Sequence, residues 1–188
     1  MTNASSAVAA PVYVFLTTGF EEIEALATVD VLRRAGLAVQ TVSLTGQRQV
    51  TGAHQVGVLA DALLEAVDFA GARMLVVPGG TTAFNEHEEF KQRLLAFARA
   101  GGPVAAICAS PAVLGGLGLL QGRQATCYPG FEQGLAGAVL RTDEAVVVDG
   151  PITTGRGPGL TLQFALALVE QLAGAAKREE VARGLLLA

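Results

Sequence analysis

Cys108 is the residue whose type and position in this chain best suit covalent chemistry. It follows an apolar run over residues 104–107, which predicts a buried parallel strand, and a helix is expected from about Ala109. A residue at such a turn projects beyond the carboxyl end of the sheet, as the nucleophile of an α/β enzyme does. The positive end of the helix dipole would favour a thiolate, so we predict a reactive cysteine with a lowered pKa. The alternative is a buried structural cysteine.

Glu24 is the candidate acid–base group. A helix is predicted over residues 21–35, and on a 3.6-residue period Glu24 shares a largely apolar face with Thr28. A carboxyl group buried on such a face has a raised pKa, so it can hydrogen-bond a thiolate or act as a general acid or base near neutral pH. Glu21 and Glu22, by contrast, are explained by the preference for acidic residues in a first helical turn.

The turn Pro78-Gly79-Gly80 follows another predicted strand, over residues 73–77. Its simplest role is a tight turn, and a backbone N–H there could also hold a developing oxyanion. The two histidines, His54 and His87, are far apart in the sequence and lack neighbouring ligand types, so we expect no zinc site. The glycines fit neither a dinucleotide fingerprint nor a phosphate loop, and we expect no cofactor.

The composition of the 188 residues is typical of a globular protein, with 51% hydrophobic and 16% charged residues. A net charge of −4 offers no basic surface for nucleic acid, and no apolar run is long enough to cross a membrane. Two cysteines make no disulfide framework, and no Lys or Arg precedes Arg33 as a signal peptide requires, so we expect a cytoplasmic protein. Residues 1–10 are predicted to be a flexible segment before one domain over 11–188.

Strands and helices alternate along the chain. Strands are expected over residues 12–17, 39–44, 73–77, 104–107 and 152–154, and helices over 21–35, 88–100, 158–173 and 179–187. A β excursion over 49–59, a helical turn capped by Asp61 and three short strands within 124–148 complete the prediction. This order indicates an α/β, doubly wound fold, with a mostly parallel sheet and helices on both faces. Ligands of such sheets bind beyond the carboxyl ends of the strands, where the Cys108 turn and residues 18–24 and 78–82 would gather.

Five segments together resemble one known family. They are GFEEIE (19–24), VDVLRRAG (29–36), VVPGG (76–80), AAICASP (105–111) and TGRGPG (154–159). Their order, in a collinear match from about Val12 to Leu187, resembles the ThiJ/PfpI superfamily and within it the DJ-1 branch. The resemblance implies a flavodoxin-like sandwich that forms a homodimer and has no metal or organic cofactor.

The resemblance also implies roles for individual residues. Cys108 matches the reactive cysteine, Glu24 its partner glutamate, and Gly80 and Ala109 the residues whose backbone N–H groups hold the oxyanion. The family's ascribed activities are conversion of methylglyoxal to lactate (glyoxalase III), deglycation of early glycation adducts, redox sensing through a cysteine sulfinate, and chaperone-like behaviour.

Two residues depart from the family's patterns. Ala109 stands where the protease-like branch has a histidine, so a peptidase is not expected. Tyr128 stands where glyoxalase-active members often have a histidine, and a phenol is a poor base near pH 7; its alternative role is packing. Arg34 and His54 match positions that approach the partner subunit's active site. We therefore predict that any catalytic imidazole is His54, acting across the dimer, and that turnover is modest.

The sequence thus favours a small enzyme that acts on reactive α-oxoaldehydes or glycated substrates. Cys108 would attack the aldehyde, and Glu24 would move the proton. Two alternatives remain open, namely a peroxide sensor in which Cys108 becomes a sulfinate beside protonated Glu24, and a holdase chaperone.

Overall fold

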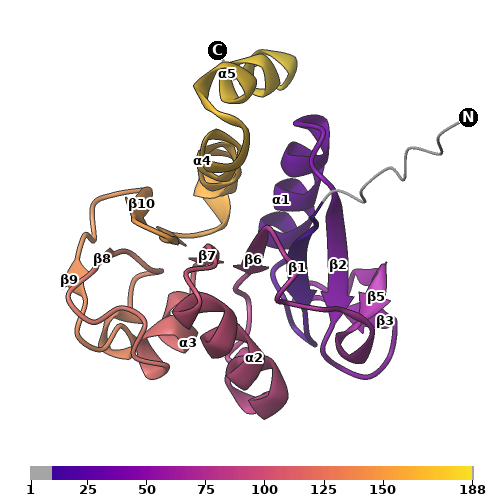
Figure 1. Ribbon diagram of the computed structural model, residues 1–188, viewed down its shortest axis with the longest axis vertical. Coiled ribbons are helices and arrows are strands. Elements are labelled where there is room, and N and C mark those ends of the chain that lie inside the picture. The colour runs from indigo at the N-terminus through magenta and orange to yellow at the C-terminus, as the bar shows by residue number, and fades with distance from the viewer. Residues whose placement is uncertain (1–9, 188) are drawn as a thin grey trace, which may run out of the picture.

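A seven-stranded sheet lies at the centre of the computed structural model, which describes residues 10–187 (Figure 1). The strands lie in the order β10-β11-β7-β6-β1-β2-β5, and all neighbours run parallel except β10, which is antiparallel to β11. Their bounds are β1 Val12–Leu16, β2 Val39–Ser43, β5 Ala62–Leu63, β6 Met74–Val77, β7 Val104–Ile107, β10 Val146–Asp149 and β11 Ile152–Gly155. The predicted mostly parallel α/β sheet is confirmed.

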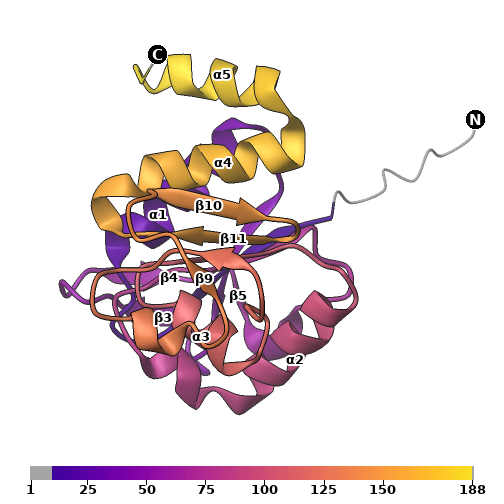
Figure 2. The same cartoon turned by 90° about the vertical axis from the view of Figure 1, so that its left-hand side faces the viewer.

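Helices cover both faces of this sheet, as predicted. One face packs against α1 (Glu22–Arg34) and α4 (Thr161–Ala173), and α5 (Ala175–Gly184) packs on α4. The other face is covered by α2 (Glu88–Arg99) and the short α3 (Pro111–Gly116). Figure 2 shows α4 and α5 on one side of β10 and β11, with α2 and α3 on the other.

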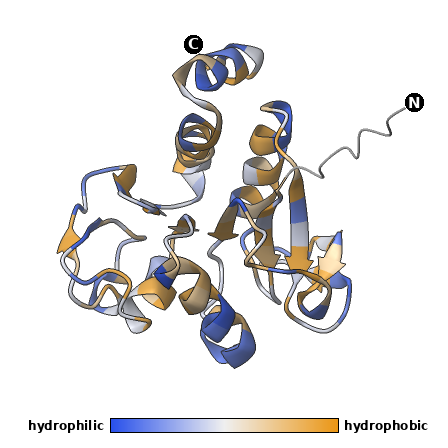
Figure 3. Ribbon diagram, viewed as in Figure 1, coloured by the Kyte–Doolittle hydropathy of each residue, from blue (hydrophilic) through white to orange (hydrophobic). Residues whose placement is uncertain are grey.

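The strands divide their side chains between two apolar clusters because successive residues of a strand point to opposite faces. In β1, Val12 and Val14 pack with α1 and α4, whereas Tyr13 and Phe15 pack with α2 and α3. All four are buried. Figure 3 shows the central strands largely in the hydrophobic colour, while much of α2 is hydrophilic.

Two short strand pairs lie outside the main sheet. The predicted β excursion is an antiparallel hairpin of β3 (Gln49–Thr51) and β4 (Gly57–Leu59). The second pair is β8 (Gln124–Ala125) with β9 (Val139–Leu140), which run parallel.

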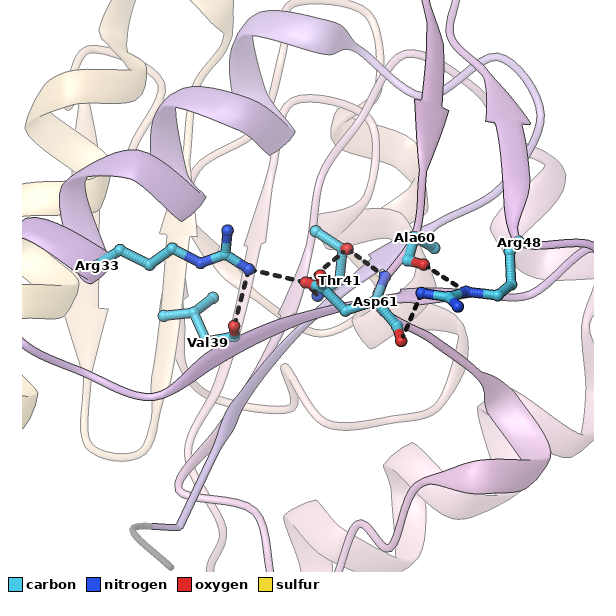
Figure 4. Close-up of polar contacts among 6 residues, drawn as sticks. All are labelled: Arg33, Val39, Thr41, Arg48, Ala60 and Asp61. Carbon is cyan, nitrogen blue, oxygen red and sulfur yellow. Dashed lines mark hydrogen bonds and ion pairs between the residues drawn. The ribbon is translucent and has the colours of Figure 1, made fainter.

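Asp61 does not cap a helical turn, and that prediction is wrong. The next two residues form β5, which pairs with β2, and a 3-10 turn follows at Leu64–Ala66. The Asp61 carboxylate instead accepts hydrogen bonds from the backbone N–H and hydroxyl of Thr41 and pairs with Arg33 at 2.7 Å (Figure 4). Arg48 donates to the carbonyls of Ala60 and Asp61. These cross-strand contacts outweigh the local preference of aspartate for a helix cap.

Three helix starts also differ from the prediction. The helix after Cys108 begins at Pro111 rather than at about Ala109, and α5 begins at Ala175 rather than at residue 179. The helix predicted from residue 158 opens with a 3-10 turn, and its α-helical part, α4, begins at Thr161. Within residues 10–187, no helix combines the length and apolar character needed to cross a membrane. The segment predicted to be flexible, residues 1–10, lies outside the described residues except for Ala10.

Candidate active site

Cys108 occupies a sharp turn at the carboxyl end of β7. Its φ is +67°, in the left-handed region that residues other than glycine rarely adopt. The backbone is held on both sides, since the Cys108 N–H donates to the Gly155 carbonyl and its carbonyl accepts from the Tyr128 N–H, each at 2.9 Å. A strained backbone conformation of this kind persists only where neighbouring segments hold it, as these two hydrogen bonds do. It directs the Cys108 side chain out of the sheet. The structure thus has the predicted elbow geometry.

Glu24 lies in the first turn of α1 and is only 1% exposed. Its Oε2 accepts a hydrogen bond from the Gly79 N–H at 2.7 Å. Its Oε1 is buried with no hydrogen-bond partner among residues 10–187. Burial raises the pKa of Glu24 to about 7, against the lowering effects of the Gly79 N–H and the Cys108 thiol. With Oε2 engaged as an acceptor, the proton of the neutral acid belongs on Oε1.

The order of the strands explains how two residues 84 positions apart come together. Glu24 follows β1 and Cys108 follows β7, and β6 lies between these strands. The turn after β6 therefore passes between the two side chains. A Cβ on Gly79 would lie 2.6 Å from the Cys108 Cβ and 2.8 Å from Glu24 Oε2. Glycine at this position lets the carboxyl and the thiol approach each other.

The prediction of a lowered pKa for Cys108 is wrong. Burial and the Glu24 carboxylate raise the pKa of its thiol to about 12. The Gly80 and Ala109 N–H groups donate to the sulfur and lower the pKa by less. Two anions cannot both form in so small a buried space, so the pair keeps one shared proton. A Cys108 thiolate therefore forms when Glu24 takes that proton.

A cavity of about 440 Å³ opens in front of Cys108. Gly80 and Ala109 line it, as the sequence led us to expect, and so does Tyr128, which is 44% exposed. Gly80 has a φ of +91°, and a Cβ there would lie 2.3 Å from the Glu21 backbone nitrogen. The remaining lining residues are Thr81, Thr82 and Phe131.

Arg34 and His54 do not line the cavity of their own chain. Arg34 lies near the end of α1 and pairs with Asp30 at 2.7 Å. His54 lies in the β3–β4 hairpin, where its Nδ1 is 2.9 Å from Glu22 Oε2. The premise that His54 lacks neighbouring ligand types is therefore wrong. Their predicted approach to a partner's active site stays a prediction.

Sequence reasoning missed several contacts between distant segments. Gly79 was interpreted as part of a turn, whereas its N–H fixes Glu24. The preference for acidic residues in a first helical turn explains the position of Glu22 in the sequence, but Glu22 is also buried and accepts the backbone N–H of His54 at 2.7 Å. His87 is half-buried and hydrogen-bonds Thr17 Oγ1 at 2.8 Å, a contact across 70 positions of the sequence. Of these features, only the Pro78-Gly79-Gly80 turn could be recognised in the sequence.

The sequence matches the family model described as the DJ-1/PfpI family over residues 10–171. The chain belongs to the DJ-1/PfpI family. This match includes every strand of the main sheet and both members of the Cys108–Glu24 pair. The resemblance drawn from the sequence motifs is thereby confirmed.

Members of the DJ-1/PfpI family from several organisms are similar along most of their length. Protein dj-1beta of Drosophila melanogaster is 39% identical over 179 residues, which cover 93% of this chain and 96% of that protein. The glutathione-independent glyoxalase DJR-1.2 of Caenorhabditis elegans is 31% identical over 170 residues, covering 89% and 91%. The solved structure of oxidized Toxoplasma gondii DJ-1 gives a TM-score of 0.90 at 35% identity, with 96% of this chain and all of that chain covered. The flavodoxin-like fold is confirmed by this likeness.

Proposed function

We propose that this protein is a cysteine-dependent enzyme that converts small α-oxoaldehydes, such as methylglyoxal, to 2-hydroxy acids without glutathione. The observation that carries the proposal is the Cys108–Glu24 pair, which places a thiol beside a buried carboxyl with a pKa of about 7. The cavity in front of the pair is lined by the polar side chains of Thr81, Thr82 and Tyr128, which suits a small carbonyl compound. The C. elegans relative is named a glutathione-independent glyoxalase, which supports the same activity.

The first step is addition of sulfur to the aldehyde. Glu24 takes the thiol proton, and the Cys108 thiolate attacks the aldehyde carbon. The C=O π electrons move to oxygen, where the Gly80 and Ala109 N–H groups, which lie against the sulfur, stabilise the negative charge. Glu24 then returns its proton to that oxygen, which gives a neutral hemithioacetal.

The second step moves hydrogen between the two carbons. The Glu24 carboxylate removes the proton from the former aldehyde carbon, forming an enediolate, and returns it to the neighbouring carbon, while the hydroxyl proton of the hemithioacetal passes to the former ketone oxygen. The product is a thioester of the 2-hydroxy acid. Water cleaves the thioester and restores the thiol, so the net reaction is methylglyoxal plus water to lactate. One carbon is oxidised and the other reduced, so the reaction consumes no external oxidant.

The test is a lactate assay on purified protein incubated with methylglyoxal. We expect lactate from the wild type, none above background from Cys108→Ser, and a loss of roughly 10²-fold or more from Glu24→Gln. Cys127→Ser is the matched control, because Cys127 is buried away from the cavity, and it should retain activity. Equal lactate formation by wild type and Cys108→Ser would refute the proposal. Glycated peptides in place of methylglyoxal test deglycase activity, which would begin with the same attack.

A peroxide-sensing function is the second candidate, and the oxidized form of the T. gondii relative favours it. Two successive reactions of the Cys108 thiolate with peroxide would give a sulfinate and release two waters. Protonated Glu24 would donate a hydrogen bond to that sulfinate. Intact mass after mild peroxide should show two added oxygens in the wild type and less stable sulfinate in Glu24→Gln and Glu24→Asp. Equal oxidation of all three proteins would contradict this function.

A further inference from the structure

A second cluster of chemically capable side chains lies where the β3–β4 hairpin meets the start of α1. It consists of Glu21, Glu22 and His54, whose ligand atoms all lie within 4.8 Å of one another. The His54 Nδ1 is 2.9 Å from Glu22 Oε2 and 3.7 Å from Glu21 Oε2. None of the three residues lines the Cys108 cavity of its own chain.

The fold holds Glu22 in place before any ligand arrives. Glu22 Oε1 accepts the backbone N–H of His54 at 2.7 Å and that of Val56 at 3.4 Å. The hairpin approaches closely enough that a Cβ on Gly52 would lie 2.3 Å from this oxygen. One carboxylate oxygen is thus fixed by the backbone, and Oε2 faces the imidazole.

Glu21 adds a second carboxylate to the cluster. Its Oε2 lies 3.7 Å from His54 Nδ1, and its side chain is 11% exposed. Negative charge is favoured at the start of a helix, so the start of α1 suits two neighbouring carboxylates.

We propose that Glu21, Glu22 and His54 bind a divalent metal ion of the zinc type. Ligand atoms around tetrahedral Zn²⁺, at bond lengths of about 2.0–2.1 Å, lie roughly 3.3 Å apart. The two distances at His54 Nδ1 bracket that value. One imidazole nitrogen with two carboxylate oxygens selects zinc-like ions over Mg²⁺ and Ca²⁺, which prefer oxygen alone. The His54 side chain is 70% exposed, so the ion enters from solvent and water completes its coordination.

Equilibrium dialysis with Zn²⁺ tests the proposal. We expect one bound ion per chain in the wild type and an affinity at least about tenfold lower in Glu21→Gln and His54→Gln. Glu21→Gln is the informative variant, because the substitution removes the charge of the side chain and keeps its size. His87→Gln is the matched control, because His87 contacts Thr17 and lies outside the cluster. Thermal unfolding confirms that each variant is folded.

A thiol is the competing zinc ligand, so Cys108→Ser is dialysed in parallel and should bind like the wild type. Co²⁺ bound at the cluster should give weak visible bands without the near-ultraviolet charge-transfer band of a thiolate ligand. Zinc binding that is lost in Cys108→Ser but kept in His54→Gln would place the ion at the cysteine and overturn the proposal. Absence of binding to the wild type at micromolar Zn²⁺ would overturn it as well.

Discussion

Cys108 and Glu24 act as one titrating unit, because burial and contact make the proton of each depend on the other. The carboxyl, with a pKa of about 7, loses its proton first, while the thiol, with a pKa of about 12 beside the carboxylate, keeps its own. The resulting pair carries one negative charge that moves to sulfur when the thiol proton moves to the Glu24 carboxylate. Near neutral pH the main form is therefore the thiol beside the carboxylate, and a thiolate requires transfer of the thiol proton to Glu24.

The rate of Cys108 alkylation by iodoacetamide should reveal this shared proton. In the wild type the rate should rise through pH 7 and then level off, because the singly charged pair is the reactive species. Glu24→Gln should lack the inflection near pH 7. Peptide mapping should find Cys108 labelled before Cys127, which is buried and has a pKa raised to about 11 by that burial. A wild-type rate that keeps climbing with constant slope from pH 7 to 9 would contradict the shared proton.

Glu24 should also make the folded state less stable as the pH rises. Its carboxyl has an ordinary pKa of 4.5 and a folded-state pKa of about 7, so between these values the folded protein binds more protons than the unfolded chain. The stability contribution of the protonated acid is complete below pH 4.5 and is lost by roughly 3 kcal/mol as the pH passes 7. Urea unfolding of wild type and Glu24→Gln at pH 5 and pH 8 measures this loss. The variant should gain stability relative to wild type at pH 8, and an unchanged difference between the two pH values would refute the raised pKa.

At the scale of elements, the active site depends on glycines where chain segments cross closely. The turn after β6 passes between Glu24 and Cys108 only because Gly79 has no side chain. The short helix α3 packs in the same way on residues 134–136, in the loop that follows the cavity residues Tyr128 and Phe131. Such contacts make the positions of the lining residues depend on backbone packing rather than on side-chain size.

Two neighbouring glycines of α3 provide a matched test. A Cβ on Gly115 would lie 2.0 Å from the Gly134 carbonyl oxygen, whereas a Cβ on Gly116 has nothing within 4 Å. Gly115→Ala should lower the free energy of unfolding by about 1–3 kcal/mol, because the added methyl group would overpack this contact. Gly116→Ala should leave it unchanged or raise it by up to about 1 kcal/mol, because alanine restricts the unfolded chain more than glycine. Urea unfolding measures the free energy of unfolding of both variants. Equal changes in the two would show that the contact between Gly115 and the Gly134 carbonyl leaves room for a methyl group.

At the scale of the whole molecule, the surface formed by the start of α1 and the β3–β4 hairpin carries several exposed hydrophobic residues. They are Ile23, Leu26, Val56 and Leu59. Exposed apolar groups that gather on one face are typical of an interaction surface, and a homodimer is the assembly expected from the family resemblance. His54 belongs to the same hairpin, so this surface is also where a residue could reach a partner's active site.

Light scattering at micromolar concentration should give twice the 19.2 kDa mass of the chain. Leu59→Asp, at the most exposed of these positions in β4, should shift the protein to the monomer because it would bury an unpaired charge. Val148→Asp, at another exposed hydrophobic position on β10 outside this surface, is the control and should remain dimeric. A monomeric wild type would count against the predicted assembly.

If the dimer brings His54 to the partner's Cys108, His54→Ala should lower methylglyoxal turnover by roughly 10²-fold. Tyr128→His, which restores an imidazole within the same chain, should raise turnover or leave it unchanged. Lactate formation by each variant is the measurement. A fully active His54→Ala would mean that Glu24 moves the proton alone.

The sequence alone determined the order of the strands and helices, the elbow at Cys108 and the burial of Glu24. These features depend on apolar runs, periodicity and turn residues that lie close together in the chain. The tertiary structure decided which groups meet: Gly79 with Glu24, Glu22 with His54, and Asp61 with Thr41. It also reversed the predicted shift of the Cys108 pKa, because a pKa depends on the distance to a charge and on burial, and both are set by segments far apart in the sequence.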